Sequence, residues 1–193
     1  MIEKRRSFLN QQRHLDPKRL VFLDESGFRL GAPPHYGWAP CGEKSPGKSV
    51  QGSWQTMTML GAISLDGFRG FLTIDAATDS EIFTAFVRHQ LAPNLRPGDI
   101  VVMDNLSAHK NEDALAALRE VGATALFLPP YSPALNPDEL VWNHVKTHHV
   151  GRAAIESLEH LKSLVLRSLR ALQRSPQKIQ AFFREQHVRY ASI

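Results

Sequence analysis

The stretch DIVVMDN, residues 99–105, places a carboxylate directly after a run of four apolar residues. A short apolar run bounded by polar residues predicts a buried β-strand, here ending at Asp104. A carboxylate at the end of a buried strand is costly to desolvate unless a charge partner or a metal ion accepts it. The stretch therefore predicts a central strand with an acidic site at its end.

Two other acidic residues stand in related settings. The stretch LVFLDES, residues 20–26, predicts a strand that ends at Asp24. Further along, LNPDE opens a predicted helix and brings Glu139, with 34 residues between Asp104 and Glu139. Taken singly, each aspartate is typical of a turn, and NPDE is typical of a capping box with Asn at the N-cap and Glu reaching back. Together, the three acids form the ligand set that two-metal phosphodiester chemistry needs.

The rest of the chain predicts an α/β protein of RNase H-like fold, with a mixed five-stranded sheet flanked by helices. The first and fourth strands lie side by side in that fold, so Asp24 and Asp104 would share one cleft. The dipeptide Asp66-Gly67 between two β-like runs predicts a hairpin. The expected elements are strands over 19–24, 53–65, 68–75, 99–104 and 124–128, and helices over 79–91, 111–121, from 136, 158–173 and 176–187.

Charge is distributed unevenly along the chain. Residues 1–20 carry six Lys/Arg and two Asp/Glu, residues 140–193 carry nine and three, and the stretch between carries eight and fourteen. An acidic centre between basic flanks suits a metal site bordered by surfaces that meet phosphates, although solvated helix faces give the same counts. The single cysteine, Cys41, excludes an internal disulfide and a cysteine-based zinc cage. With no apolar run near ~20 residues and no signal region, we expect a cytoplasmic protein without a membrane partner.

The sequences around Asp24, Asp104 and Glu139, together with the motif LPPYSPALNP at residues 128–137, resemble the catalytic domain of DDE transposases. The resemblance is specifically to the mariner-like superfamily and its bacterial insertion-sequence relatives. The resemblance covers residues 20–146. It implies metal-dependent phosphodiester cleavage and strand transfer of an insertion sequence, in association with the bacterial nucleoid. It also implies element ends and target DNA as partners, and a homodimer in the active complex.

The resemblance assigns roles to the three acids. Asp24, Asp104 and Glu139 would be the catalytic residues and the ligands of two Mg²⁺ or Mn²⁺ ions, with Asp24 shared between them. Hard oxygen donors favour these ions over zinc. Asp138 stands where the family has an aliphatic residue, so two acids are neighbours, and the register of the motif selects Glu139.

Five further residues are candidates for supporting the acids or contacting DNA. Asn105 and His109 belong to the word DNLSAHK, which also resembles the family, and His109 suits a phosphate contact, a role in orienting the nucleophile or a plain helix start. Glu25 suits either a supporting role or solvation. Trp38, in the Gly- and Pro-rich stretch 31–52, suits DNA contact or packing, and Lys146 suits a backbone phosphate or solvation.

Three histidines on and after the same helix invite a test as a zinc site. His144 and His148 are four residues apart and share a helix face, and His149 follows. No HExxH arrangement and no third ligand of suitable spacing accompany them, so we expect no zinc there.

The chain divides into 1–18, a basic linker or N-terminal extension; 19–150, the catalytic domain; and 151–193, C-terminal helices packed on that domain. Relatives usually carry helix-turn-helix modules before the catalytic domain, whereas here the first acid comes at residue 24. We therefore expect a catalytic domain alone, from a truncated product, a split gene or an excised piece.

Two other functions fit the same acids: an RNase H-like nuclease that only hydrolyses, and a catalytically silent DNA-binding remnant of a decayed element. The PPYSP word and the 34-residue spacing favour the transposase over the nuclease. The presence of all three acids argues against lost chemistry.

Overall fold

A mixed five-stranded sheet forms the centre of the protein. The computed structural model describes residues 2–12, 14–30, 38–44, 55–153 and 155–192. The strands, in the spatial order β3-β2-β1-β4-β5, are β1 (Leu20–Arg29), β2 (Thr56–Ser64), β3 (Gly67–Ile74), β4 (Ile100–Met103) and β5 (Thr124–Phe127). The first three strands are antiparallel neighbours, whereas β4 and β5 run parallel to β1. The predicted RNase H-like sheet, with its first and fourth strands adjacent, is confirmed.

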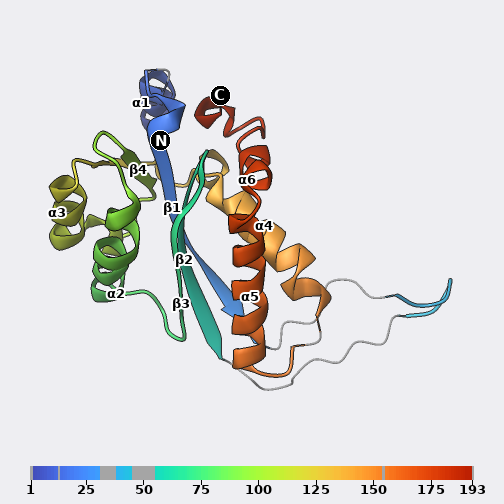
Figure 1. Ribbon diagram of the computed structural model, residues 1–193. Coiled ribbons are helices and arrows are strands. Elements are labelled where there is room, and N and C mark those ends of the chain that lie inside the picture. Colours follow the sequence, from blue (N-terminus) through green and yellow to red (C-terminus); the bar gives the residue numbers. More distant parts are fainter. Residues whose placement is uncertain (1, 13, 31–37, 45–54, 154, 193) are drawn as a thin grey trace.

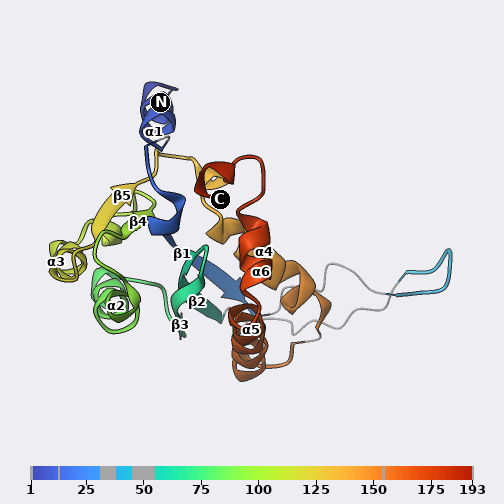
Figure 2. The ribbon, with the colours of Figure 1, turned by 45° about the horizontal axis from the view of Figure 1, so that its top comes forward.

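Helices cover both faces of this sheet (Figures 1 and 2). Those on one face are α2 (Ser80–Phe86), which continues as a π-helical turn over Val87–Leu91, and α3 (Glu112–Glu120). Those on the other face are α4 (Asp138–His148), α5 (Leu158–Gln173) and α6 (Pro176–Phe182). Helix α1 (Ile2–Gln12) lies at one end, beside the C-terminal segment.

The two faces of the sheet produce two hydrophobic clusters, because successive strand residues point to opposite sides. Along β1, Leu20, Phe22 and Phe28 belong to the cluster under α4, α5 and α6. Val21 and Leu23 belong to the cluster under α2 and α3. The same alternation places Asp24 toward α4 and Glu25 toward α2.

Several boundaries differ from those the sequence predicts, and the differences in β1, α4 and α6 matter most. β1 runs on to Arg29, so Asp24 lies within a strand and does not end it; the antiparallel pairing with β2 continues past the point where β4 stops. Helix α4 begins at Asp138, and no side chain caps it. Asn136 instead accepts a hydrogen bond from the Asp138 amide in a tight turn, so the capping-box interpretation is wrong. Helix α6 ends at Phe182 rather than at residue 187.

Both terminal segments contact the rest of the protein. For the N-terminal residues the sequence leaves a linker and a frayed helix as alternatives. Residues 2–12 form the helix α1, and Phe8 is buried with its ring edge-on to that of Tyr190. Most of the expected loop at 31–52 lies outside the described residues, except 38–44. Among the described helices, none is long and apolar enough to cross a membrane.

Candidate active site

The unequal lengths of β1 and β4 create the site. The last paired residues of these two strands are Phe22 and Val102, and β4 ends one residue later. Beyond that point β1 is paired with β2, where Asp24 lies opposite Gly61. Asp24 therefore stands at an open step in the sheet, next to the segment that leaves β4.

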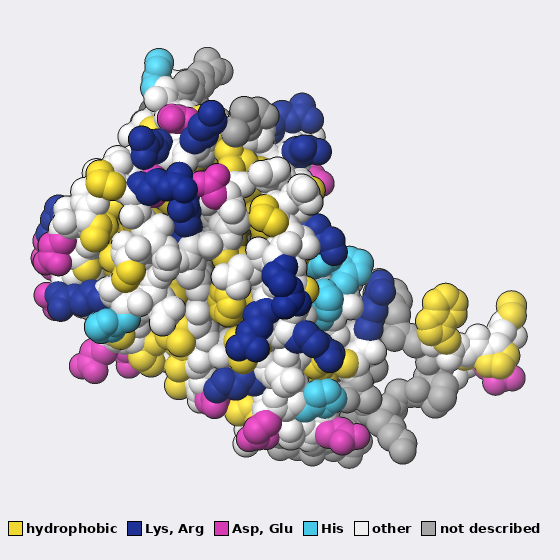
Figure 3. Space-filling model, in the orientation of Figure 1, with side chains coloured by type: hydrophobic (Ala, Val, Ile, Leu, Met, Phe, Trp, Pro, Cys, Tyr) yellow, Lys and Arg dark blue, Asp and Glu magenta, His cyan; other side chains and the backbone are white. Residues whose placement is uncertain are grey.

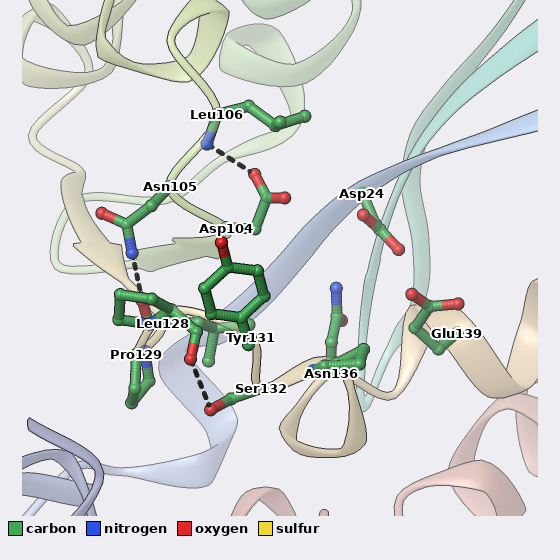
Figure 4. Close-up of a pocket in the computed structure, with 12 residues that line it drawn as sticks. Asp24, Asp104, Asn105, Leu106, Leu128, Pro129, Tyr131, Ser132, Asn136 and Glu139 are labelled. Atoms are coloured by element: carbon green, nitrogen blue, oxygen red, sulfur yellow. Dashed lines mark hydrogen bonds between the residues drawn. The ribbon is translucent and has the colours of Figure 1, made fainter. Parts of the chain in front are cut away.

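The three predicted acids line one cavity of about 430 Å³ at this step (Figure 4). Asp24 comes from β1, Asp104 follows β4, and Glu139 comes from the first turn of α4. Asp24 and Glu139 face each other, while Asp104 lies across the cavity near Leu106. The other walls come from the segments after β4 and β5 and before α4: Asn105, Leu106, Leu128, Pro129, Pro130, Tyr131, Ser132, Pro133 and Asn136.

A tryptophan that sequence reasoning missed holds Asp24. The indole Nε1 of Trp142 donates a hydrogen bond of 3.2 Å to Asp24 Oδ2. Its ring needs the glycine opposite Asp24, because a Cβ at Gly61 would lie 2.4 Å from Trp142 Cη2. Two sequence signals accord with this arrangement, although neither identifies Asp24 as the partner of Trp142. Trp142 lies three residues after Glu139, on the same helix face, and Gly61 interrupts a strand, which often marks a close approach.

Burial and neighbouring negative charges disfavour the charged form of Asp24. Burial, then the charge of Glu139, and more weakly that of Asp104, raise the pKa of Asp24 to about 7, although hydrogen bonds from the Glu25 backbone and Trp142 oppose the shift. A cation between Asp24 and Glu139 would relieve this repulsion and favour the charged form.

Asp104 is held by the opposite layer of the protein. His109, fully buried against the Phe83 ring, places Nδ1 2.7 Å from Asp104 Oδ1, and the Leu106 amide donates to the same oxygen. Burial works to raise the pKa of Asp104, but His109, the Leu106 amide and Lys110 together lower it. The second nitrogen of His109 lies 3.9 Å from Glu25 Oε1.

His109 thus lies between Asp104, which follows β4, and Glu25, which follows Asp24 on β1. His109 is fully buried beside Asp104, so it offers no exposed face to a phosphate, and its roles in orienting the nucleophile or starting a helix stay predictions. Glu25 lies partly buried beside His109, and the choice between a supporting role and a solvated acid stays a prediction.

The neighbouring acid, Asp138, belongs to the protein interior. Its side chain is fully buried, and neither carboxylate oxygen has a hydrogen-bond partner among the described residues. Burial, then the charges of Asp24 and Glu139, raise the pKa of Asp138 well above its usual value. Glu139 lines the cavity and Asp138 does not, so the geometry selects Glu139 between the two.

The other three predicted residues, Asn105, Lys146 and Trp38, lie in different surroundings. Asn105 lines the cavity and donates to the Leu128 carbonyl, which ties the segments after β4 and β5 together. The Lys146 ammonium lies 5.4 Å from the centre of the Phe28 ring, on α4 but away from the cavity lining. Trp38 is fully exposed, so packing does not explain it.

The donor set suits a hard divalent cation, since three carboxylates line one cavity. Within the described part of the chain, however, no three His, Cys, Asp or Glu side chains lie close enough together to hold one ion. The acids are therefore not a preassembled cage around a single ion.

The sequence was compared with families of known proteins. The model of the DDE superfamily endonucleases matches residues 19–162, most of the chain and all three acids. The chain belongs to this family. No curated protein matches this DDE domain.

Solved structures give the same fold. The catalytic domain of Mos1 mariner transposase is 14% identical over 99% of this chain and 92% of its own, with a TM-score of 0.60. The Mos1 paired-end complex with the left transposon end is 15% identical over 93% of this chain and 60% of its own, with a TM-score of 0.65. The mariner Mos1 paired-end complex with Mg gives a TM-score of 0.68 at 14% identity, over 98% and 61%. This DDE domain thus spans about three-fifths of those longer Mos1 chains.

Proposed function

We propose that this protein is the catalytic part of a DNA transposase, which cuts phosphodiester bonds at the ends of an insertion sequence and joins them to target DNA. One observation carries the proposal: Asp24, Asp104 and Glu139, far apart in the chain, line a single cavity within the residues matched to the DDE endonucleases. Mos1 structures of the same fold include a strand transfer complex and complexes with Mg or Mn, which supports this choice.

In this proposal the three acids hold two divalent cations, Mg²⁺ or Mn²⁺. Asp24 pairs with Glu139 for one and with Asp104 for the other. Bound there, the cations would favour deprotonation of the attacking oxygen and offset the charge on the leaving oxygen. Trp142 and His109 each contact one oxygen of an aspartate, Asp24 Oδ2 and Asp104 Oδ1, and so help to fix both carboxylates.

The reaction consists of two similar displacements. In cleavage, a water oxygen attacks the phosphorus, and the bond from phosphorus to the 3′ oxygen breaks, giving a 3′-hydroxyl and a 5′-phosphate. In joining, that 3′-hydroxyl attacks a target phosphorus and displaces the target's 3′ oxygen. Neither displacement requires a covalent bond to the protein.

The rim of the cavity suits DNA. The Tyr131 side chain is 88% exposed at this edge, and exposed aromatic rings stack on bases irrespective of sequence. Two element ends must meet for joining, so we propose a homodimer in the active complex.

The proposal is tested by incubating pre-cleaved element ends and target DNA with the full chain, supplied with its recognition modules in cis or in trans. We expect joined products that require Mg²⁺ or Mn²⁺. Glu139→Gln should abolish joining, whereas the matched variant of its neighbour, Asp138→Asn, should retain it because Asp138 lies outside the cavity.

Two results would contradict the proposal. Efficient hydrolysis of the RNA strand of RNA–DNA hybrids, with no joining under any condition, would favour the nuclease. DNA binding without metal-dependent cleavage would favour the silent remnant.

A further inference from the structure

A basic surface lies at the opposite end of α4 from the acids. It contains three histidines of α4 and its C-terminus, together with cations from three neighbouring segments: Arg152 before α5, Arg167 on α5 and Lys178 on α6. We call the set His144, His148, His149, Arg152, Arg167 and Lys178 the His–Arg patch. Figure 3 shows Lys, Arg and His side chains gathered on this side of the molecule, over α5 and α6.

Ring contacts and mutual repulsion show that the patch is one cluster. The ring centres of His144 and His148 are 4.8 Å apart, and those of His144 and His149 are 5.6 Å apart. Burial, then His148, Lys178, Arg167 and Arg152, lower the pKa of His149. Burial, then His148, His149 and Lys178, lower the pKa of His144. The imidazoles of His144 and His149 thus lie in a positive field.

Acidic side chains do not neutralise this field. Among the described residues, none of the ion pairs involves Arg152, Arg167 or Lys178. The situation differs on the α2–α3 side, where Arg88 pairs with Asp113 and Arg119 pairs with Glu112. Favourable cation placement at helix C-termini accounts for single basic residues. It does not account for cations from three segments directed at one histidine group.

We propose that the His–Arg patch binds the phosphate backbone of duplex DNA, as a second DNA-contacting surface in addition to the carboxylate cavity. Exposed, unpaired cations release condensed counterions when they meet phosphates, which is the main source of sequence-independent affinity. The patch deepens the proposed function and rests on it, because the DNA is the same substrate.

Distance and chain position support one continuous duplex. The rise along an α-helix places residues 144–149 roughly 8–15 Å from Glu139 along α4. Arg167, Arg170 and Arg174 share one exposed helix face and extend the patch along α5 by about 10 Å. Both spacings are shorter than one turn of a duplex, so a duplex that follows α4 from the cavity rim would reach the patch within about one turn.

Binding of the full chain to a short mixed-sequence duplex, measured in EDTA over a range of salt, tests this inference. Arg167→Gln with Lys178→Gln should weaken binding roughly ten- to a hundredfold near 0.1 M salt and lower the slope of log K against log[salt] by about 2. Arg88→Gln with Arg119→Gln removes the same charge from the other face and should leave that slope unchanged. Arg167→Lys with Lys178→Arg should bind like the unaltered protein.

Equal losses in the two charge-removing pairs would overturn the inference, since net charge alone would then explain binding. Unchanged binding in the patch variant, or equal competition by polyglutamate or single-stranded RNA, would also overturn it. In EDTA this binding does not depend on the metal that joining requires. A failed joining assay with an intact patch effect would therefore refute the transposase and leave the DNA surface standing.

Discussion

The two ends of α4 have opposite electrostatic surroundings, negative at its start and positive at its end. At its start, Glu139 brings negative charge beside buried Asp24, and Asp138 is fully buried next to Glu139. At its end, His144, His148 and His149 lie among exposed cations without acidic partners. The first end depends on a few atoms in exact places and on cations that offset repulsion. The second depends on summed charge, so it tolerates change at any one residue.

The largest effect is expected at the acid end. Asp24→Asn keeps the shape and an acceptor for Trp142 but removes the charge that would hold both cations. Metal-dependent cleavage and joining should fall below detection, while the metal-free protein becomes more stable at neutral pH because repulsion with Glu139 is lost. Activity assays and thermal melts in EDTA measure the two effects. Glu156→Gln, at an exposed acid, serves as the control, and full activity of Asp24→Asn would break the account.

The pH dependence of stability follows from the same charge. Asp24 keeps its proton up to a pKa of about 7 in the folded protein and loses it near 3.8 in the unfolded chain. The folded state therefore binds more protons between these values, so the contribution of Asp24 to stability falls as pH rises from about 4 to about 7. Asp138, whose pKa burial raises well above its usual value, adds a fall of the same sign. The free energy of unfolding in EDTA should fall by about 4 kcal/mol over this window, from roughly 3 pKa units at 1.36 kcal/mol each.

Urea unfolding across that pH range measures the dependence. Mg²⁺ or Mn²⁺ should restore stability mainly above pH 7, because binding requires the deprotonated carboxylate. A stability that rises with pH in EDTA, or that is unchanged in Asp24→Asn, would contradict the assignment.

The support of Asp24 predicts an intermediate effect. Trp142→Phe removes the hydrogen bond to Asp24 and keeps most of the ring, so activity should fall roughly ten- to a hundredfold. Gly61→Ala places a methyl group against the indole and should cost about 1–3 kcal/mol of stability with a similar loss of activity. Activity at saturating metal, beside denaturant unfolding, separates the two variants. Normal activity in both would show that Trp142 only fills space.

The smallest effect is expected among the histidines. Protonation at lower pH adds charge to the His–Arg patch, and because the pKa values of His144 and His149 are lowered from 6.5, DNA affinity should rise mainly between pH 7 and pH 5. His144→Gln with His149→Gln should remove most of that rise and leave binding at pH 8 nearly unchanged. Fluorescence anisotropy with duplex DNA in EDTA measures it, with His160→Gln as the control on exposed α5. An undiminished rise would show that other groups carry the pH dependence.

Sequence alone was enough for the sheet and for the three acids. The strand pattern, the Asp-Gly hairpin and the motifs shared with the family predicted the order of elements. Asp24, Asp104 and Glu139 do line one cavity. Strand length was not predictable, because the continuation of β1 depends on pairing with β2 rather than on its own apolar run.

Long-range partners of the acids were also beyond local patterns. The hydrogen bond from Trp142 joins residues 118 positions apart, and the space for its ring depends on Gly61 of a third element. The burial of Asp138 and His109 likewise follows from the packing of α4 and α2, which a motif does not report. The segments that meet in the His–Arg patch come together only in three dimensions.

The central claim is that the acid end of α4, and not its histidine end, belongs to a metal site. Crystals of the protein grown or soaked with Mn²⁺ test this directly through anomalous scattering. We predict peaks inside the cavity, between Asp24 and its two partners Asp104 and Glu139, and their loss in Asp24→Asn. Peaks at His144, His148 and His149 with none in the cavity would contradict the account.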